Sequence, residues 1–154
     1  MPATLRDDIR QSKPFTSLQH EANLNVIRTA AVLSDALELL LKPHGITSTQ
    51  YNVLRILRGA EPGGLCRNEL RDRMLTRMPD MTRLLDRMED AGLVTRAREA
   101  EDRRQVLTRI TEEGSRLLAE LDEPVLQFHR TQLGHMSDDQ LRSLSELLSL
   151  ARSR

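Results

Sequence analysis

Four arginines stand where they could bind phosphate oxygens and the edges of nucleic-acid bases. Arg83 and Arg87 are about one helical turn apart in a segment of helical periodicity, so they share one face. Arg103 and Arg104 are adjacent in a charged segment between two stretches of alternating polarity. A guanidinium presents its N–H donors in a planar fork that matches phosphate and the major-groove edge of guanine. These residue types therefore favour the binding of anions, and of nucleic acid in particular.

We expect the first pair to lie on a short helix that begins at Pro79. Proline suits the first helical position and the residue before a proline is disfavoured in the α conformation, so Met78 is the predicted N-cap. Apolar residues recur at steps of three and four and predict a buried stripe of Met81, Leu84, Leu85, Met88 and Ala91. Gly92 follows where a left-handed C-terminal cap is expected. The helix is thus predicted to be short, capped and two-faced.

The polar face of this helix holds candidates for nucleic-acid contact. With the residues at its N-terminal end, the candidates are Arg77, Met78, Asp80, Thr82, Arg83 and Arg87. Asp80 could accept from a cytosine amine, but we expect it to cap the helix or to stabilise its dipole. Asp86 is expected to pair with Arg83 and fix it. An ordinary solvated helix face is the plainer interpretation, and the neighbouring elements weigh against it.

After Gly92 the hydrophobic period changes from helical to alternating. Residues 93–98 and 105–110 are predicted strands, and the charged loop 99–104 is the predicted tip of their hairpin. A projecting loop can follow a phosphate backbone or enter a minor groove while a helix reads the major groove. The candidate contacts are Arg98, Asp102, Arg103 and Arg104. A plain turn with a surface ion pair is the alternative for this loop.

In their order and spacing these residues resemble the MarR family of bacterial transcription regulators. The matching segments are residues 82–89, Gly92-Leu93-Val94, Asp102-Arg103-Arg104, Leu107-Thr108 and residues 111–114. The resemblance extends over nearly the whole chain from about His20. It implies a winged helix-turn-helix that binds double-stranded DNA as a homodimer. It also implies that Asp102 and Arg104 form the wing's aspartate-x-arginine element, in which the arginine reaches DNA and the aspartate orients neighbouring basic groups.

The composition is compatible with such a protein. The 154 residues suffice for one domain with dimerisation arms, and with 2% aromatic residues the core must be aliphatic. The formal net charge is zero, so overall charge does not indicate nucleic-acid binding. Arginines outnumber acids five to three in residues 71–87 and again in 96–109, whereas acids outnumber arginines eight to five in residues 112–154. A basic centre with acidic arms is consistent with DNA bound on one surface.

The predicted fold is mainly α with a small β-wing. Residues 1–16 are expected to be a flexible segment, residues 46–110 the winged helix-turn-helix lobe, and residues 17–45 and 111–154 the dimerisation helices of a single MarR-type domain. The first long helix, expected over residues 17–42, is apolar on more than one side. One small domain cannot cover so much apolar surface, so we expect a partner subunit to do so.

The resemblance also implies an effector pocket where the dimerisation helices meet the DNA-binding lobe, often for small aromatic acids. Arg28, His44 and Tyr51 are the candidate pocket residues, although each suits packing or the surface equally well. We expect a repressor of nearby genes that such a ligand relieves. A ligand-independent winged-helix regulator and a winged-helix module for protein association are the alternatives.

No pattern in the sequence predicts an enzyme, a cofactor or a metal site. A glycine-rich phosphate loop and a nucleophile elbow are missing, and the four histidines and one cysteine show no zinc spacing. Cys66 is expected on a short strand, where a free cysteine is usually inert, so redox sensing is a minor hypothesis. A membrane-spanning run and a signal peptide are not visible, so we expect a cytoplasmic protein.

Overall fold

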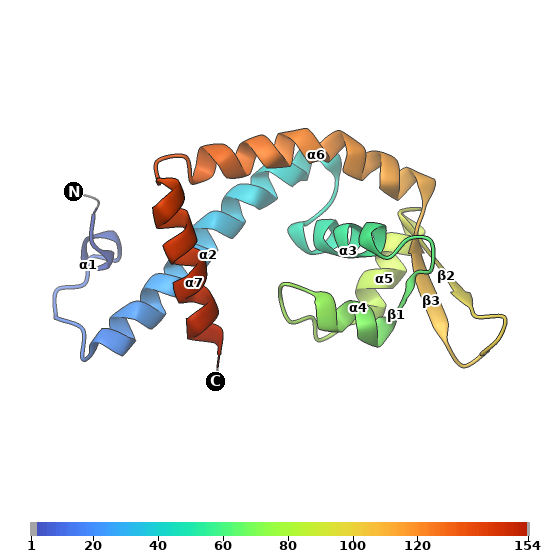
Figure 1. Cartoon of the computed structure of the whole chain (residues 1–154), viewed down its shortest axis with the longest axis horizontal. Coiled ribbons are helices and arrows are strands. Elements are labelled where there is room, and N and C mark those ends of the chain that lie inside the picture. The colour runs from blue at the N-terminus through green and yellow to red at the C-terminus, as the bar shows by residue number, and fades with distance from the viewer. Residues whose placement is uncertain (1–2, 154) are drawn as a thin grey trace. The chain divides into compact units, whose positions relative to one another are not determined.

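The structure, a computed structural model, describes residues 3–153. Met1, Pro2 and Arg154 lie outside the described residues, and with them the outer ends of the segments predicted as 1–16 and 111–154. The chain forms two compact units, residues 1–45 and residues 46–154. It is mainly helical with one small three-stranded antiparallel sheet (Figure 1), which confirms the predicted fold class.

The first unit is dominated by one long helix. Its elements are α1 (Leu5–Asp8), α2 (Leu18–Leu41) and the 3-10 turn η1 (Lys42–His44). Ser17 caps α2 by accepting a hydrogen bond from the amide of His20 at 3.1 Å, so the helix starts where expected. Gly45 closes the unit in the left-handed region, with φ of 74°. The turn α1 was not predicted, while the mobility of the 1–16 segment stays a prediction.

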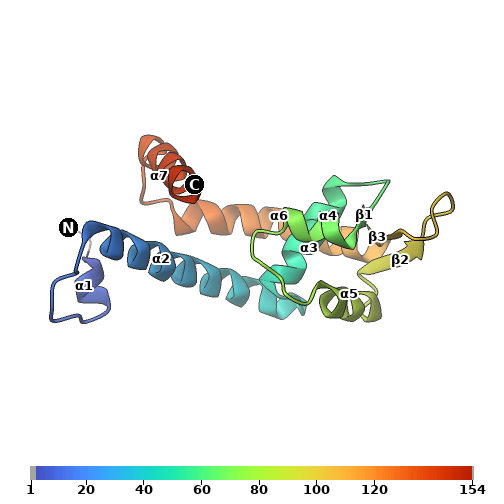
Figure 2. The same ribbon diagram turned by 90° about the horizontal axis from the view of Figure 1, so that it is seen from below.

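The second unit contains the sheet, in the order β1-β3-β2. The strands are β1 (Leu65–Cys66), β2 (Val94–Arg98) and β3 (Val106–Ile110). In the register Leu65 pairs with Thr108, and Val94 pairs with Ile110. Alternation along β3 turns Thr108 and Ile110 into the core. The loop between β2 and β3 projects away from the helices of this unit (Figure 2), as the predicted wing requires.

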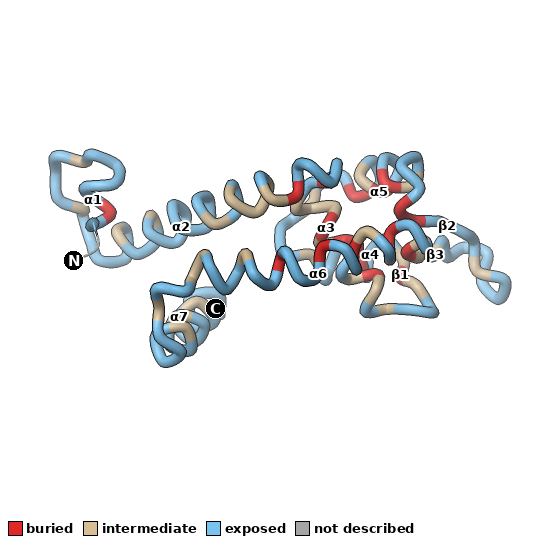
Figure 3. The backbone as a smooth tube through the Cα atoms, turned by 90° about the horizontal axis from the view of Figure 1, so that it is seen from above, coloured by how far each residue is buried: buried red, intermediate tan, exposed pale blue. Residues whose placement is uncertain are grey.

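Helices α3 (Ser48–Gly59), α4 (Arg67–Arg73) and α5 (Met81–Asp90) enclose the core with the sheet. Thr47 begins α3 with a capping box, in which its hydroxyl accepts from the amide of Gln50 and the Gln50 side chain accepts from the Thr47 amide. Fully buried side chains from the three helices meet there, namely Val53, Leu54, Leu57, Leu70, Leu85 and Met88. Figure 3 shows the buried residues gathered in this part of the unit.

Two further helices, α6 (Glu112–Gln132) and α7 (Asp138–Arg152), follow the sheet. Helix α6 begins at its cap Thr111 and buries Leu118, Leu121 and Val125. It continues through Pro124, which lies inside the helix. Helix α7 begins at a capping box of Ser137 and Gln140 and contains no buried residue. Leu147 and Leu150 of α7 are exposed, and its other leucines are half-buried.

An ion pair ties α3 to α6. The guanidinium of Arg58 donates two hydrogen bonds to the carboxylate of Asp122, at 2.9 and 2.8 Å. The hydrogen bonds raise the pKa of Arg58 and lower the pKa of Asp122, against the opposing effect of partial burial. Because α6 follows directly from β3, this bidentate pair helps to set the position of the wing relative to α3.

The start of α5 differs from the prediction. The helix begins at Met81, and its N-cap is Asp80, whose carboxylate accepts from the amide of Arg83 at 3.0 Å. Met78 is not the cap, because its side chain has no strong hydrogen-bond acceptor, whereas aspartate is among the preferred N-caps. Pro79 consequently lies in the loop before the helix. The expectation that Asp80 caps the helix is confirmed.

Candidate nucleic-acid interface

Helix α5 has the two faces that its periodicity predicts. Met81, Leu85 and Met88 are buried, whereas Leu84 is half-buried and Ala91, at the C-cap, is exposed rather than buried. The exposed positions of the helix include Thr82, Arg83, Asp86 and Arg87. Of the N-terminal candidates in the preceding loop, Arg77 is exposed and Met78 is half-buried. The helix therefore presents a polar, arginine-bearing face outside the core.

The C-terminal end of α5 leads directly into the wing. Gly92 adopts φ of 73°, and its amide donates to the carbonyl of Glu89 at 2.9 Å. The amide of Leu93 donates to the carbonyl of Met88 at 3.0 Å, which completes a Schellman motif around the left-handed cap that the sequence predicted at Gly92. The carbonyl of Leu93 then accepts from the amide of Thr111 at 3.1 Å. The end of the helix and the base of the hairpin are thereby fixed together.

Asp102 folds the tip of the wing. Its carboxylate accepts from the amide of Arg104 at 3.0 Å, and its carbonyl accepts from the amide of Gln105 at 3.0 Å. A guanidinium nitrogen of Arg98 donates to the carbonyl of Arg103 at 3.2 Å, so Arg98 is partly engaged inside the wing. The side chains of Arg103 and Arg104 make no hydrogen bond or ion pair with any described residue. Both guanidinium groups are exposed and available to an anion.

A three-residue ion cluster joins α5 to β2. The guanidinium of Arg96 bonds to the carboxylate of Asp86 at 2.6 Å and to that of Glu89 at 2.5 Å, while its side chain is 24% exposed. Partial burial opposes the charged form and is the largest single effect, but the hydrogen bonds that Arg96 donates to Glu89 and Asp86, together with the negative charges of those carboxylates, outweigh it and raise the pKa of Arg96. The prediction that Asp86 pairs with Arg83 was wrong. Its partner is Arg96 on β2, and residue spacing within α5 could not indicate a contact with a strand.

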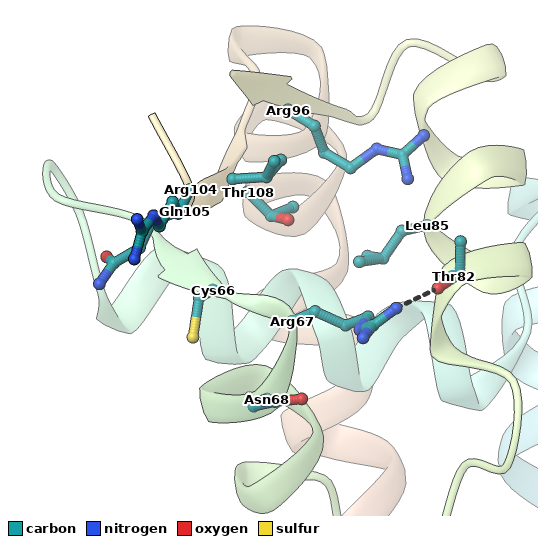
Figure 4. Close-up of a pocket in the computed structure, with 10 residues that line it drawn as sticks. Cys66, Arg67, Asn68, Thr82, Leu85, Arg96, Arg104, Gln105 and Thr108 are labelled. Atoms are coloured by element: carbon teal, nitrogen blue, oxygen red, sulfur yellow. Dashed lines mark hydrogen bonds between the residues drawn. The ribbon is translucent and has the colours of Figure 1, made fainter. Parts of the chain in front are cut away.

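Sequence analysis identified neither Arg96 nor Arg67 as part of the surface formed by α5 and the wing. Arg67 lies at the start of α4. Its Nη1 donates a hydrogen bond to the hydroxyl oxygen of Thr82 at 2.9 Å. The two residues are 15 positions apart and belong to different helices, so neither motif nor periodicity links them. Figure 4 shows the arginine extending from the beginning of α4 to the first turn of α5.

An open cavity of about 520 Å³ lies between α5, the start of α4 and the wing. Its lining includes the apolar side chain of Leu85 and three arginines, Arg67, Arg96 and Arg104. In Figure 4, Arg104 lies at the side of β1 and Arg96 extends toward α5. The cavity thus lies beside the arginine-bearing face of α5 and the wing.

The three candidate effector residues are divided between the units. Arg28 on α2 and His44 on η1 are exposed residues of the first unit. Tyr51 on α3 is 7% exposed and belongs to the second unit. Its hydroxyl accepts from the guanidinium of Arg55 at 3.2 Å, and the guanidinium carbon of Arg55 lies 5.9 Å from the centre of its ring. The role of these residues in binding an effector stays a prediction.

Other chemistry has less support in the described residues. Between residues 3 and 153 no group of three or more His, Cys, Asp or Glu side chains is placed to hold a metal ion. Cys66 is half-buried at the N-cap of α4, where its amide donates to the carboxylate of Glu69 at 2.9 Å. Among the same residues, no helix has the length and apolar character that a membrane crossing requires.

Comparison with known proteins gives this architecture a family. A sequence model of the MarR family matches residues 44–105. The HTH-type transcriptional regulator FarR of Neisseria gonorrhoeae is 32% identical over 112 residues, which cover 73% of this chain and 75% of that protein. The chain belongs to the MarR family. It is therefore a DNA-binding transcriptional regulator of the winged-helix type.

Two further similarities accompany that assignment. The crystal structure of a MarR transcription factor from Planctomyces limnophilus is 41% identical, with a TM-score of 0.67, and the match covers 89% of this chain and 99% of that one. The homoprotocatechuate degradative operon repressor of Escherichia coli is 28% identical over 109 residues, 71% of this chain and 72% of that protein. The MarR-family resemblance in the sequence, and the winged helix that it implied, are confirmed.

Proposed function

We propose that this MarR-family regulator binds a pseudo-palindromic DNA operator as a homodimer and represses nearby genes until a small ligand releases it. The observation that carries the DNA contact is the combination of an exposed arginine face on α5 with two arginines at the tip of the adjoining wing whose side chains pair with no described residue. Thr82, Arg83 and Arg87 enter the major groove, while Arg103 and Arg104 grip the backbone or the minor groove.

Exposed apolar surface supports the homodimer. On α7 the side chains of Leu147 and Leu150 are 63% and 69% exposed. On α2 the exposed large apolar residues are Leu18, Val26, Ile27, Val32 and Leu39. Two terminal regions with so much apolar surface would gain stability by packing against a second copy across a two-fold axis. The two α5 helices, one from each protomer, would then serve as recognition helices and contact half-sites about 10 bp apart.

The proposal of repression draws on one relative, and the class of the effector is proposed from the compound in that relative's name. The Escherichia coli relative is named as the repressor of a degradative operon for homoprotocatechuate, which is an aromatic acid. By analogy we propose a small aromatic acid as effector for this chain, with Arg28, His44 and Tyr51 as the pocket residues. A ligand shifts the equilibrium only if it binds the state that cannot engage DNA more tightly than the state that can.

Selection of bound duplexes from a random library, at low and at moderate salt, tests the DNA-binding proposal. We expect the purified protein to recover a pseudo-palindrome whose half-sites are about one helical turn apart. If no consensus is recovered and weak binding disappears in salt, the winged helix serves protein association instead, and the proposal is wrong. A consensus with no response to any effector would leave a ligand-independent regulator.

Arg104→Ala tests the wing contact. Each phosphate contact contributes a slope of about −0.9 to the dependence of log K on log salt concentration. Loss of one contact from each protomer should therefore flatten the slope by roughly two and weaken binding to all sequences alike. The measurement is fluorescence anisotropy on the selected duplex over a range of salt concentrations. Arg130→Ala, an exposed arginine on α6, is the control, and an equal slope in both variants would argue against the contact.

The effector is tested by thermal unfolding with a panel of phenolic carboxylates. A ligand at about 100 times its Kd stabilises the folded state by roughly 2.7 kcal/mol, which raises Tm by several degrees. We expect such a rise with at least one carboxylate, a smaller rise with the matching uncharged phenol, and a reduced response in Arg28→Ala. The same compound should release the protein from the selected duplex. The effector proposal fails if every carboxylate leaves Tm unchanged.

A further inference from the structure

Thr82 lies in the first turn of α5, the proposed recognition helix. It is the second residue of α5, and its side chain is exposed. A threonine inside a helix can donate its hydroxyl hydrogen to the carbonyl four residues earlier. Four residues before Thr82 is Met78, which lies outside the helix. No described residue accepts a hydrogen bond from the Thr82 hydroxyl, so its hydrogen remains available to a ligand.

The hydrogen bond from Arg67 fixes what this hydroxyl can do. A guanidinium can only donate, so the Thr82 oxygen is the acceptor in the 2.9 Å contact with Arg67. One lone pair of the oxygen is therefore occupied, and the positive charge beside it repels a second donor. The same charge polarises the O–H bond and strengthens it as a donor. Thr82 is thereby converted from a group that donates or accepts into one that mainly donates.

The pair stands where it can reach a bound duplex. Arg67 and Thr82 both line the cavity on the wing side of α5, and both also line a smaller hollow of about 240 Å³ on the side of the 78–80 loop. They therefore border both hollows, and Figure 4 shows the hydrogen bond that joins them as a dashed line. In a helix-turn-helix the N-terminal residues of the recognition helix contact base edges, and Thr82 is in the first turn of α5.

We infer that Arg67 and Thr82 act together as a donor pair that selects guanine at one base pair of each half-site. In the major groove guanine presents two acceptors, N7 and O6, and no donor, whereas the edge of cytosine presents an amino donor and adenine presents one donor beside one acceptor. Arg67 is thus a specificity-determining residue, both through those of its N–H groups that bond to no described residue and through its effect on Thr82. This inference rests on the proposed DNA-binding function.

The test uses the intact protein and the duplex recovered from the random library, with each base pair of the half-site replaced in turn. Thr82→Val removes the hydroxyl at nearly constant shape, and Thr82→Ser keeps it. Arg67→Met keeps an unbranched side chain but removes all the donors. Arg73→Met, an exposed arginine at the end of the same helix, is the control. Affinities are measured at one salt concentration, and the salt slope is measured separately for each variant.

We expect the ratio of the affinity for guanine to the affinity for the other bases to fall about tenfold in Thr82→Val and in Arg67→Met, at the same base pair. The double variant should lose no more than either single variant, because the two residues act as one unit. Thr82→Ser and Arg73→Met should keep the preference. Replacing that guanine by 7-deazaguanine, which lacks the N7 acceptor, should weaken the wild-type protein and leave Thr82→Val unaffected.

Three results would overturn the inference. The first is uniform weakening on all duplexes with a flatter salt slope, which would show a phosphate contact instead. The second is an additive loss at two different base pairs. The third is an unchanged preference in both variants. If instead the wild-type protein recovers no consensus, the proposed function fails and the inference fails with it, so the two failures are distinguishable.

Discussion

Gly114→Ala is expected to destabilise the second unit, because the added methyl group has no room there. A Cβ at position 114 would lie 2.5 Å from the carbonyl oxygen of Leu93, 2.9 Å from a side-chain carbon of Ile110 and 3.3 Å from one of Leu54. The nearest atom is backbone, and it accepts a hydrogen bond from the amide of Thr111 at 3.1 Å. It can therefore move only if the junction between α5, the wing and α6 moves with it.

Overpacking of this kind typically costs about 1–3 kcal/mol, which is a large share of the roughly 5–15 kcal/mol that stabilises a domain. We expect a fall in Tm of several degrees and a lower urea midpoint with an unchanged m-value. Gly59→Ala is the matched control, since Gly59 ends α3 and a Cβ there meets no atom within 4 Å. It should be neutral or stabilising by up to about 1 kcal/mol. Equal stability of the two variants would contradict the close contact at Gly114.

Arg96→Ala is expected to weaken DNA binding by roughly 10- to 100-fold while the protein remains folded. Arg96 joins the recognition helix to the wing through Asp86 and Glu89. Without Arg96 the angle between α5 and the wing is no longer fixed, although both elements must contact DNA at the same time. It also leaves two carboxylates without their partner on the arginine-bearing side of the lobe, where they would repel phosphates. Both effects act against binding, so the loss should exceed that from any single exposed arginine.

A neutralised variant separates the two effects. Adding Asp86→Asn and Glu89→Gln to Arg96→Ala removes the repulsion but leaves the elements unjoined, so affinity should recover only in part. Arg142→Ala is the control, because Arg142 forms an exposed ion pair with a single carboxylate, that of Asp139, within α7 at 2.8 Å. Affinity for the selected duplex is measured by anisotropy, and folding is checked by thermal unfolding. Unaltered affinity of Arg96→Ala would show that the cluster does not position the helix and the wing.

The local features of this protein were predictable from its sequence. The capping boxes at Thr47 and Ser137, the left-handed Gly92 and the buried stripe of α5 each depend on residues within a few positions of one another. Periodicity and capping chemistry operate over that range. The order of helix, wing and glycine turn also sufficed to indicate the family, because those segments keep their spacing along the chain.

The start of α5 marks the limit of such local reasoning. Met78 and Pro79 formed an acceptable beginning by the rules for proline, but Asp80 offered the stronger cap, and the helix begins after it. Two favourable local signals competed within three residues. Asp80 became the cap because its carboxylate accepts a hydrogen bond from the Arg83 amide. The sequence rules for proline and for capping residues did not by themselves show which signal would be stronger.

The contacts that assemble the candidate interface were decided by the tertiary structure. Asp86 pairs with Arg96 because the hairpin register and the packing of α5 bring them together, and not with Arg83 on its own helix. Arg67 reaches Thr82 across two helices for the same kind of reason. A sequence specifies the residues that suit a helix or a strand, because those preferences are local. Which charged side chains meet across elements depends on distances that exist only once the core has packed.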